Sequence, residues 1–384
     1  MSGRSAPTRI IVGFPFGSVM GGAERVLRSL LRHRERAGVQ IHLVCFQDGP
    51  FVAEATGLGV PVTVIDPGRF RHPWRLILAI VRLARLLRTV QPDLCVSWLP
   101  RVQTVMAPAA LLSGHGKRIV FFQHEVPKAH GLARLATVLP CRWVIACSAS
   151  VGEATRGRWP HRDGSVVWPG IEAPVAPAPA ELALLRHDLE LHGGWPVIGI
   201  VGRLLTWKGQ DRLIDAVGLL RDRGLHVVLL IVGGSAHGVE AELEERLRAR
   251  AHELDLADRV RFCGHVPDAT MHVAVMDLLV NASNDEPFGI VLLEAMALGV
   301  PVLAVDRGGP REIVREGSGM LVATGSPPEL ADAVADLLSD PQRRRALAAA
   351  GRARFDEHFS AERMVKEVGR DLAGVAGERV TRRR

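Results

Sequence analysis

The chain has 384 residues, too many for one ordinary hydrophobic core, so two domains of similar size are expected. Its net charge is only +7, and aromatic residues make up 5% with no Tyr, so nucleic-acid binding through stacked bases is not expected. Five cysteines without metal-like spacing predict reduced thiols in a cytoplasmic protein. Neither a signal peptide nor an apolar run long enough to span a membrane is expected from the sequence.

The first half alternates short apolar strands with helices, which predicts a doubly wound parallel sheet. A strand at 8–13 leads through a glycine-rich loop at 14–22 into a helix at 23–36. Gly21 and Gly22 would let a ligand approach the backbone, although the loop is not GxGxxG and an ordinary tight turn is the alternative. His124 follows a strand at 118–122, and open α/β sheets bind ligands at the carboxyl ends of their strands. Further strands are predicted at 40–46, 60–65, 93–97 and 143–147.

A helix is predicted at 74–90, with apolar side chains on one face and arginines on another. Docking of the apolar face on the sheet is the simpler interpretation. A basic amphipathic helix also suits an anionic membrane surface, so peripheral contact with the inner membrane face stays open. The arginines of this helix are Arg75, Arg82, Arg85 and Arg88.

A Pro/Ala-rich linker is predicted at 173–190, between an N-terminal domain at 1–172 and a C-terminal domain at 191–360. The second domain repeats the alternation, with strands at 197–201, 227–232, 260–263, 277–281 and 302–305. The loop after its first strand carries Arg203 and Lys208 just before a helix. Two cations beside a helix start would clamp a phosphate group, and a solvated surface pair is the alternative.

The stretch 281–301 carries two carboxylates, Glu286 and Glu294, on either side of a helix start predicted at Pro287-Phe288-Gly289, because proline suits the first turn of a helix. The helix is apolar nearly all round and therefore largely buried, so its carboxylate needs donors. The two acids would lie roughly 12 Å apart if helical rise applies throughout, with a helix N-terminus that favours phosphate between them. This layout suits a nucleotide sugar. A helix cap and a structural ion pair are the alternative.

Several motifs in order resemble the retaining glycosyltransferases of family 4, which have the GT-B fold. In the second half these are GRLLTWKG, GHVPD, NASNDEPFGIVLLEAMALGVPV and DRGGPREIV, and the first half adds GGAER, QPDLCVSW, FFQHE and VVWPGIE. The resemblance covers nearly the whole chain. It implies an α/β architecture of two Rossmann-like domains facing across a cleft, with a final helix at about 361–384 crossing back to the N-terminal domain.

The resemblance also implies roles for individual residues. Arg203 and Lys208 match the pair that holds the donor diphosphate. Glu286 and Glu294 match the two acids at the donor sugar and the ribose, and His124 matches a histidine near the reacting face of the sugar. The remaining donor-binding positions that it implies are Gly21, Gly22, Val266, Phe288, Gly289 and Ile290.

The activity implied is hexose transfer from a nucleoside-diphosphate sugar, UDP by family frequency, by a front-face mechanism. No DxD motif is present, so neither a metal nor another cofactor is expected. The acceptor expected is a sugar, a lipid-linked molecule or a natural product. Two alternatives keep the same fold: a sugar-nucleotide epimerase or coupling pseudo-transferase, and a non-catalytic nucleotide binder. The chain departs from the family pattern at Glu125, where Asp is usual, and at Trp168-Pro169-Gly170, where Asn-Gly is usual.

Overall fold

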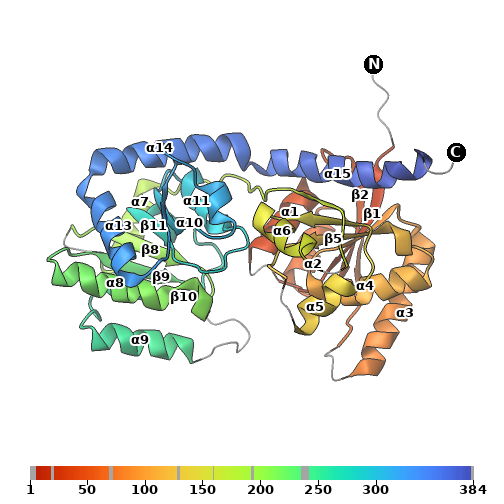
Figure 1. Ribbon diagram of the computed structural model, residues 1–384, viewed down its shortest axis with the longest axis horizontal. Helices are drawn as coiled ribbons and strands as arrows, with labels where there is room; N and C mark the ends of the chain where they lie inside the picture. The colour runs from red at the N-terminus through yellow and green to blue at the C-terminus, as the bar shows by residue number, and fades with distance from the viewer. Residues whose placement is uncertain are drawn as a thin grey trace, which may run out of the picture. The chain divides into compact units, whose positions relative to one another are not determined.

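The computed structural model describes residues 6–18, 21–68, 72–127, 130–158, 160–191, 194–234 and 242–381. The chain divides into two compact units, which are described separately below; their helices and strands are labelled in Figure 1. Unit 1 comprises Met1–Glu172 and Ala361–Arg384, and unit 2 comprises Ala173–Ser360. The expected C-terminal helix therefore belongs to the same unit as the first half of the chain, and its last residues, 382–384, lie outside the described residues.

Unit 1 is built on a seven-stranded sheet in the order β3-β2-β1-β4-β5-β6-β7, with every pair parallel. Its central strands are aliphatic runs buried on both faces, as parallel sheets require. The strand order reverses between β1 and β4, which makes their carboxyl ends the switch point of this sheet. The strands are β1 (Thr8–Phe14), β2 (Val39–Cys45), β3 (Val62–Val64), β4 (Leu94–Ser97), β5 (Ile119–Gln123), β6 (Trp143–Ala146) and β7 (Gly164–Val166).

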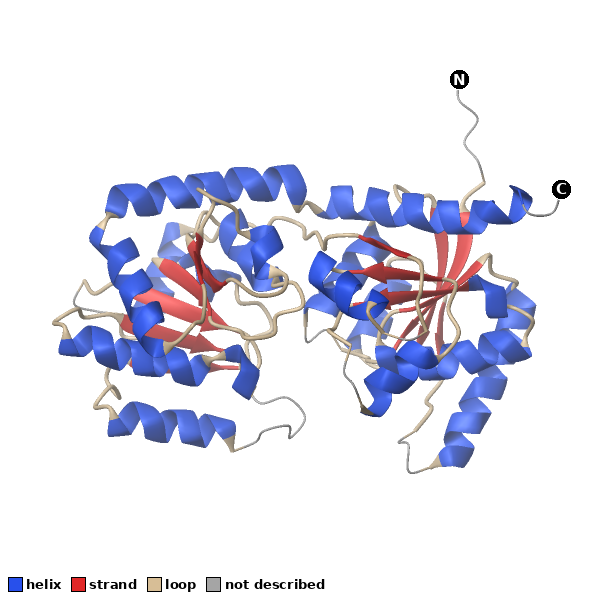
Figure 2. Ribbon diagram, in the orientation of Figure 1, coloured by secondary structure: helices blue, strands red, loops and turns tan. Residues whose placement is uncertain are grey.

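Helices cover both faces of this sheet (Figure 2). On one face, α3 and α4 share a core with the central strands. The C-terminal helix α15 packs against α1 and β1, and at Gly369 an added Cβ would lie 2.2 Å from the Ala37 carbonyl oxygen. This close approach leaves no room for a larger side chain. The helices are α1 (Gly22–Arg32), α2 (Pro50–Gly57), α3 (Pro73–Val90), α4 (Pro100–Leu112), η1 (Gly116–Arg118), α5 (Gly131–Val138), α6 (Ala149–Arg156) and α15 (Ala361–Thr381).

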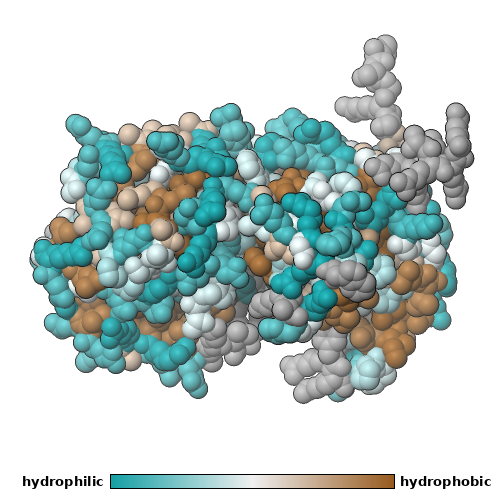
Figure 3. Space-filling view, in the orientation of Figure 1, coloured by the Kyte–Doolittle hydropathy of each residue, from teal (hydrophilic) through white to brown (hydrophobic). Residues whose placement is uncertain are grey.

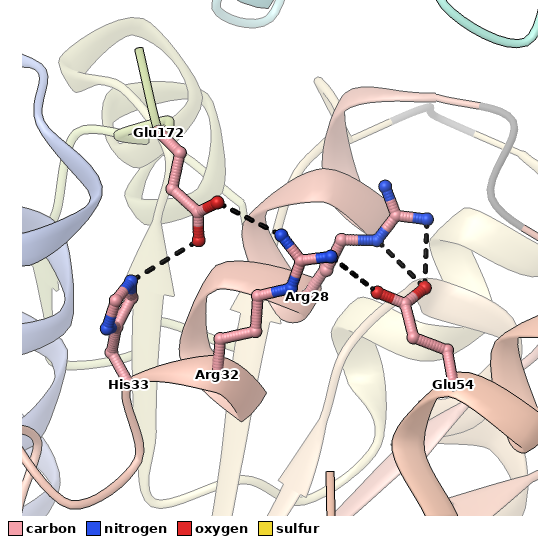
Figure 4. A network of polar contacts seen from close by, with 5 residues as sticks. All are labelled: Arg28, Arg32, His33, Glu54 and Glu172. Carbon is pink, nitrogen blue, oxygen red and sulfur yellow. Dashed lines mark hydrogen bonds and ion pairs between the residues drawn. The ribbon is translucent and has the colours of Figure 1, made fainter. Parts of the chain in front are cut away.

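The chain leaves and re-enters unit 1 at neighbouring points. The Ala361 N–H donates to the Ile171 carbonyl at 2.9 Å, so α15 begins beside the segment at which the first half ends. Glu172 is held from the other side by Arg32 and His33 at the end of α1, at 3.0 and 3.3 Å (Figure 4). Arg32 also pairs with Glu54 of α2, which Arg28 contacts as well. These contacts hold the end of the first half of the chain, at Ile171 and Glu172, and the start of α15 beside α1.

Unit 2 is built on a six-stranded parallel sheet in the order β10-β9-β8-β11-β12-β13, and its order reverses between β8 and β11. The strands are β8 (Val197–Val201), β9 (Val228–Val232), β10 (Val260–Gly264), β11 (Leu278–Asn281), β12 (Val302–Val305) and β13 (Met320–Val322). The helices are α7 (Pro179–Asp188), η2 (Thr206–Lys208), α8 (Gln210–Asp222), α9 (Leu243–Glu253), α10 (Thr270–Ala274), α11 (Ile290–Ala297), α12 (Pro310–Ile313), α13 (Pro327–Ser339) and α14 (Pro341–His358).

The segment 173–190, expected to be a linker throughout, differs from that expectation. Its second part forms α7, because Pro179 at the first helical turn presets a helical backbone and the Glu181 carboxylate accepts from the Ala178 N–H at 2.7 Å. Arg186 then ties α7 to the Val275 carbonyl, so the helix is docked on unit 2. Within this segment, residues 173–178 and 189–190 lie outside the helix.

Candidate active site

The loop after β8 carries the two predicted phosphate-binding cations. It runs through η2 and ends at Gly209, whose φ of +79° places it in the left-handed region just before α8. A Cβ at Gly209 would lie 2.5 Å from the Ala282 carbonyl oxygen, so the glycine lets this loop approach the loop after β11. Lys208 is half-buried in this loop, whereas Arg203 is exposed. The switch point of the sheet therefore sets the two loops side by side.

Lys208 and Glu286 form an ion pair across these two loops. The Lys208 Nζ lies 2.5 Å from the Glu286 Oε2, and the side chains are only 16% and 10% exposed. The Ser283 hydroxyl donates to the same oxygen at 3.0 Å, and the Lys208 Nζ lies 4.3 Å from the centroid of the Trp207 ring. Both charges are thus compensated although they are largely removed from water, as buried charges must be.

Glycines bring a third loop, after β12, against the backbone of Glu286 and Phe288. The Gly309 N–H donates to the Glu286 carbonyl at 2.9 Å. A Cβ at Gly308 would lie 2.3 Å from that carbonyl oxygen, and one at Gly309 would lie 2.1 Å from the Phe288 Cα. The Asp306–Gly309 loop therefore fixes the backbone from which Glu286 extends.

The helix predicted to open at Pro287-Phe288-Gly289 is present, and it begins directly after these three residues. Gly289 has φ +110° and precedes α11, whose first residue is Ile290. Phe288 is buried and lies 6.2 Å, ring to ring, from Phe359. The first N–H groups of a helix have no intrahelical partners, and the macrodipole places positive charge there. An anion held at this end would therefore be stabilised.

Two donor-site predictions lie outside the Lys208–Glu286 contact. Glu294 lies in the second turn of α11 and is half-buried. Val266 is half-buried in the loop after β10, and β10 is separated from β8 by β9. No role was predicted from the sequence for Ser283 or Trp207, although both lie within three residues of Glu286 or Lys208 in the chain.

The remaining predicted residues lie in unit 1. Gly21 and Gly22 stand at the start of α1. His124 follows β5 and is stacked on Phe122 at 4.5 Å and tilted against Trp98 at 5.0 Å. Burial lowers the pKa of His124 to about 3, and its Nε2 has no hydrogen-bond partner among the described residues.

Trp98 joins these two features of unit 1, because its indole N–H donates to the Ala23 carbonyl at 2.9 Å while its ring contacts His124. His124 is thereby linked to the first turn of α1. Trp98 had not been assigned a role from the sequence, and its place directly after β4 at the switch point was the available signal.

No group of three or more His, Cys, Asp or Glu side chains that could hold a metal is present within the part of the chain that the structure describes. None of its described helices is both long enough and apolar enough to cross a membrane.

Two parallel-sheet Rossmann-like units define the GT-B class of protein. Family models match both halves of the chain: glycosyltransferase family 4 at residues 20–173 and glycosyl transferases group 1 at residues 184–354. The chain therefore belongs to the group 1 glycosyltransferases of family 4.

Three relatives illustrate this membership. HepE of Anabaena, crystallised with UDP and glucose, is similar over 95% of this chain and 99% of its own, with a TM-score of 0.82 and 26% identity. A GDP-mannose-dependent phosphatidylinositol monomannoside mannosyltransferase of Mycobacterium tuberculosis is 40% identical over 48% of this chain. That match spans 49% of the relative, so the chain aligns with about half of its length. The lipopolysaccharide core mannosyltransferase LpsB of Rhizobium meliloti is 28% identical over 81% of this chain and 88% of its own.

Proposed function

We propose that this protein transfers a hexose from a nucleoside-diphosphate sugar to an acceptor hydroxyl with retention of anomeric configuration. The observation that carries the proposal is the buried Lys208–Glu286 pair, which lies where the loops after β8 and β11 meet. A cation for the leaving diphosphate and a carboxylate for sugar hydroxyls are the two charges that such a donor requires.

In the proposed mechanism, Lys208, Arg203 and the start of α11 stabilise the charge that develops on the diphosphate. Preorganised cations and helix N–H groups act strongly there, because they are aimed at the group whose charge grows as the glycosidic bond breaks. Lys208 leaves Glu286 for the diphosphate when donor binds. The freed carboxylate of Glu286 then accepts hydrogen bonds from the sugar, and Glu294 accepts those of the ribose.

The acceptor proton is assigned to the leaving phosphate, so the reaction proceeds on one face of the sugar without a protein base. His124 fits this assignment because burial holds its pKa at about 3 and the imidazole is neutral near pH 7. Its role in the proposal is that of a neutral hydrogen-bonding group. Neither a metal nor another cofactor is required, because Lys208 and Arg203 supply the positive charge.

UDP is the proposed nucleotide, and the UDP and glucose held by HepE support it. GDP is the competing nucleotide, because the mycobacterial relative is GDP-mannose-dependent. The acceptor class proposed is a sugar, a lipid-linked sugar or a natural product.

The test is to incubate the protein with UDP-glucose or GDP-mannose in the presence and absence of candidate acceptors. Nucleoside diphosphate should be released only when acceptor is present, and NMR of the product should show the anomeric configuration of the donor. EDTA should leave the rate unchanged. Consumption of donor without acceptor would instead indicate an epimerase, and an inverted product would refute the retaining mechanism.

A further inference from the structure

The solvent-facing side of α3 carries large apolar side chains at one end and arginines at the other. In its first two turns Trp74, Ile77 and Leu78 are 59%, 62% and 40% exposed. Arg82 and Arg85 are exposed in the turns that follow. We call these five residues the α3 surface. They lie on one side of the helix, because steps of three and four residues return to the same face.

The apolar part of the α3 surface is not needed to hold α3 in place. The opposite side of the helix, with Ala79, Leu83 and Leu87, is already buried in the core of unit 1. Exposing three large apolar side chains together is costly in water, so their grouping points to a partner that covers them. Figure 3 shows apolar side chains gathered over α3 and α4.

The charge of α3 is entirely positive. No Asp or Glu occurs from 73 to 90, and the structure pairs neither Arg82 nor Arg85 with an acidic side chain among the residues it describes. Among the described residues, the ion pair of α3 is the contact of Arg75 with Asp66 at 3.9 Å, in which the two side chains are 49% and 61% exposed. The potential over this surface is therefore set by arginine.

The apolar character continues at the far end of α3. The Arg88 guanidinium donates to the Leu112 carbonyl, which places the C-terminal end of α4 beside the last turns of α3. Leu111 and Leu112 there are 53% and 56% exposed. Exposed apolar groups thus occur near both ends of a helix roughly 27 Å long, with arginines between them.

We propose that the α3 surface docks this protein on an anionic lipid surface, with Trp74, Ile77 and Leu78 inserted at the headgroup boundary. An indole is suited to this boundary, because its ring is apolar and its N–H is polar. Arginines bury their stems while their guanidinium groups meet lipid phosphates. A second copy of the chain fits worse, because α3 has no acidic side chain that could pair with Arg82 and Arg85 of the other copy.

The test is sedimentation of the full chain with vesicles of phosphatidylcholine containing about one third phosphatidylglycerol, at low salt and at about 0.5 M salt. The native chain should bind the anionic vesicles at low salt, and binding should weaken at high salt. The double variant R82Q/R85Q should weaken binding on the order of 30-fold. Each arginine near an anionic surface contributes about 1 kcal/mol, and the loss of two corresponds to roughly this factor. The variant W74S/I77S should also weaken binding, and its residual binding should be the more salt-sensitive.

The matched control is R246Q/R345Q, which removes the same charge from exposed positions of α9 and α14 in unit 2. It should bind as the native chain does. No binding of the native chain at low salt would overturn the proposal, and so would an equal loss in the control. Sedimentation velocity without lipid tests whether two copies of the chain pair through the α3 surface. A dimer that the W74S/I77S variant abolishes would show such pairing and would refute lipid docking. Unchanged thermal unfolding should accompany both α3 variants, because the substituted side chains are exposed.

Discussion

Replacing Glu286 by Gln separates the two charges of the candidate active site. Gln keeps the shape of the side chain and can still accept from Ser283, but it removes the charge that lies 2.5 Å from the Lys208 Nζ. In the proposed mechanism a diphosphate must draw Lys208 away from Glu286. The E286Q variant should therefore bind free nucleoside diphosphate more tightly than the native protein and transfer sugar more slowly.

The magnitudes follow from the burial of the pair. With the side chains 16% and 10% exposed, a hydrogen bond between two charged groups contributes roughly 1.5–3 kcal/mol. Because about 1.4 kcal/mol corresponds to a factor of ten, relief from this competition should tighten diphosphate binding roughly 10- to 100-fold. The loss of the sugar contact in the transition state should lower the transfer rate on the order of 10²–10³-fold.

Lys208→Met should behave in the opposite way for binding. It removes the cation that meets the diphosphate, so affinity for UDP and GDP should fall. It also leaves Glu286 buried without its ion pair, which should lower the free energy of unfolding by roughly 3–5 kcal/mol. Asp285→Asn is the matched control, since it removes an exposed carboxylate one residue away and should change neither quantity.

The assay is isothermal calorimetry with UDP and GDP, together with initial rates of sugar transfer. If E286Q and K208M weaken diphosphate binding equally, Glu286 belongs to the phosphate site and its assignment to the sugar is wrong. Unchanged transfer in both variants would refute the site itself.

Three further predictions concern stability. The pKa of His124 is lowered to about 3, below its usual value near 6.5, so it contributes stability that is present above pH 6.5 and is lost as pH falls toward 3. Urea unfolding should therefore show that H124F loses about 2 kcal/mol less than the native chain between pH 7 and pH 5, and equal losses would contradict this. In α15, G374A should raise the unfolding temperature, because its Cβ meets nothing within 4 Å, whereas G369A should lower it, because its Cβ would lie 2.2 Å from a carbonyl oxygen. Arg354→Ala removes donors to the Ile313 and Glu312 carbonyls at 2.6 and 2.9 Å and should cost about 1–3 kcal/mol in denaturant unfolding, with no loss counting against this role.

Local sequence patterns were sufficient to predict an element where all of its residues have the same kind of surroundings. The strand predicted at 197–201 matches β8 because it is an aliphatic run buried in a parallel sheet. The helix start after Glu286 was predicted from Pro287, which suits the first turn of a helix, and the structure begins α11 slightly later, at Ile290. Adjacent residues were sufficient to predict both elements, although not the first residue of α11.

Local patterns failed where packing or capping decided the outcome. The helix α4 was not predicted, because it contains Pro108 and is buried around much of its circumference, which removes the apolar periodicity of a surface helix. The helix α7 was predicted as linker, because Pro179 in a Pro/Ala-rich stretch indicates an extended chain unless the capping contact of Glu181 is known.

For the candidate active site, the sequence by itself determined which residue types are present and that each follows a strand. It placed Lys208 and Glu286 on separate loops, 78 residues apart, and left their contact undecided. Only the tertiary structure decided that contact, because the order β8-β11-β12 in the sheet makes their loops neighbours. His124 is similar: its position after a strand was evident, and so was Phe122 two residues earlier in β5. Its lowered pKa depends on burial, to which Trp98 contributes from the end of the neighbouring strand β4.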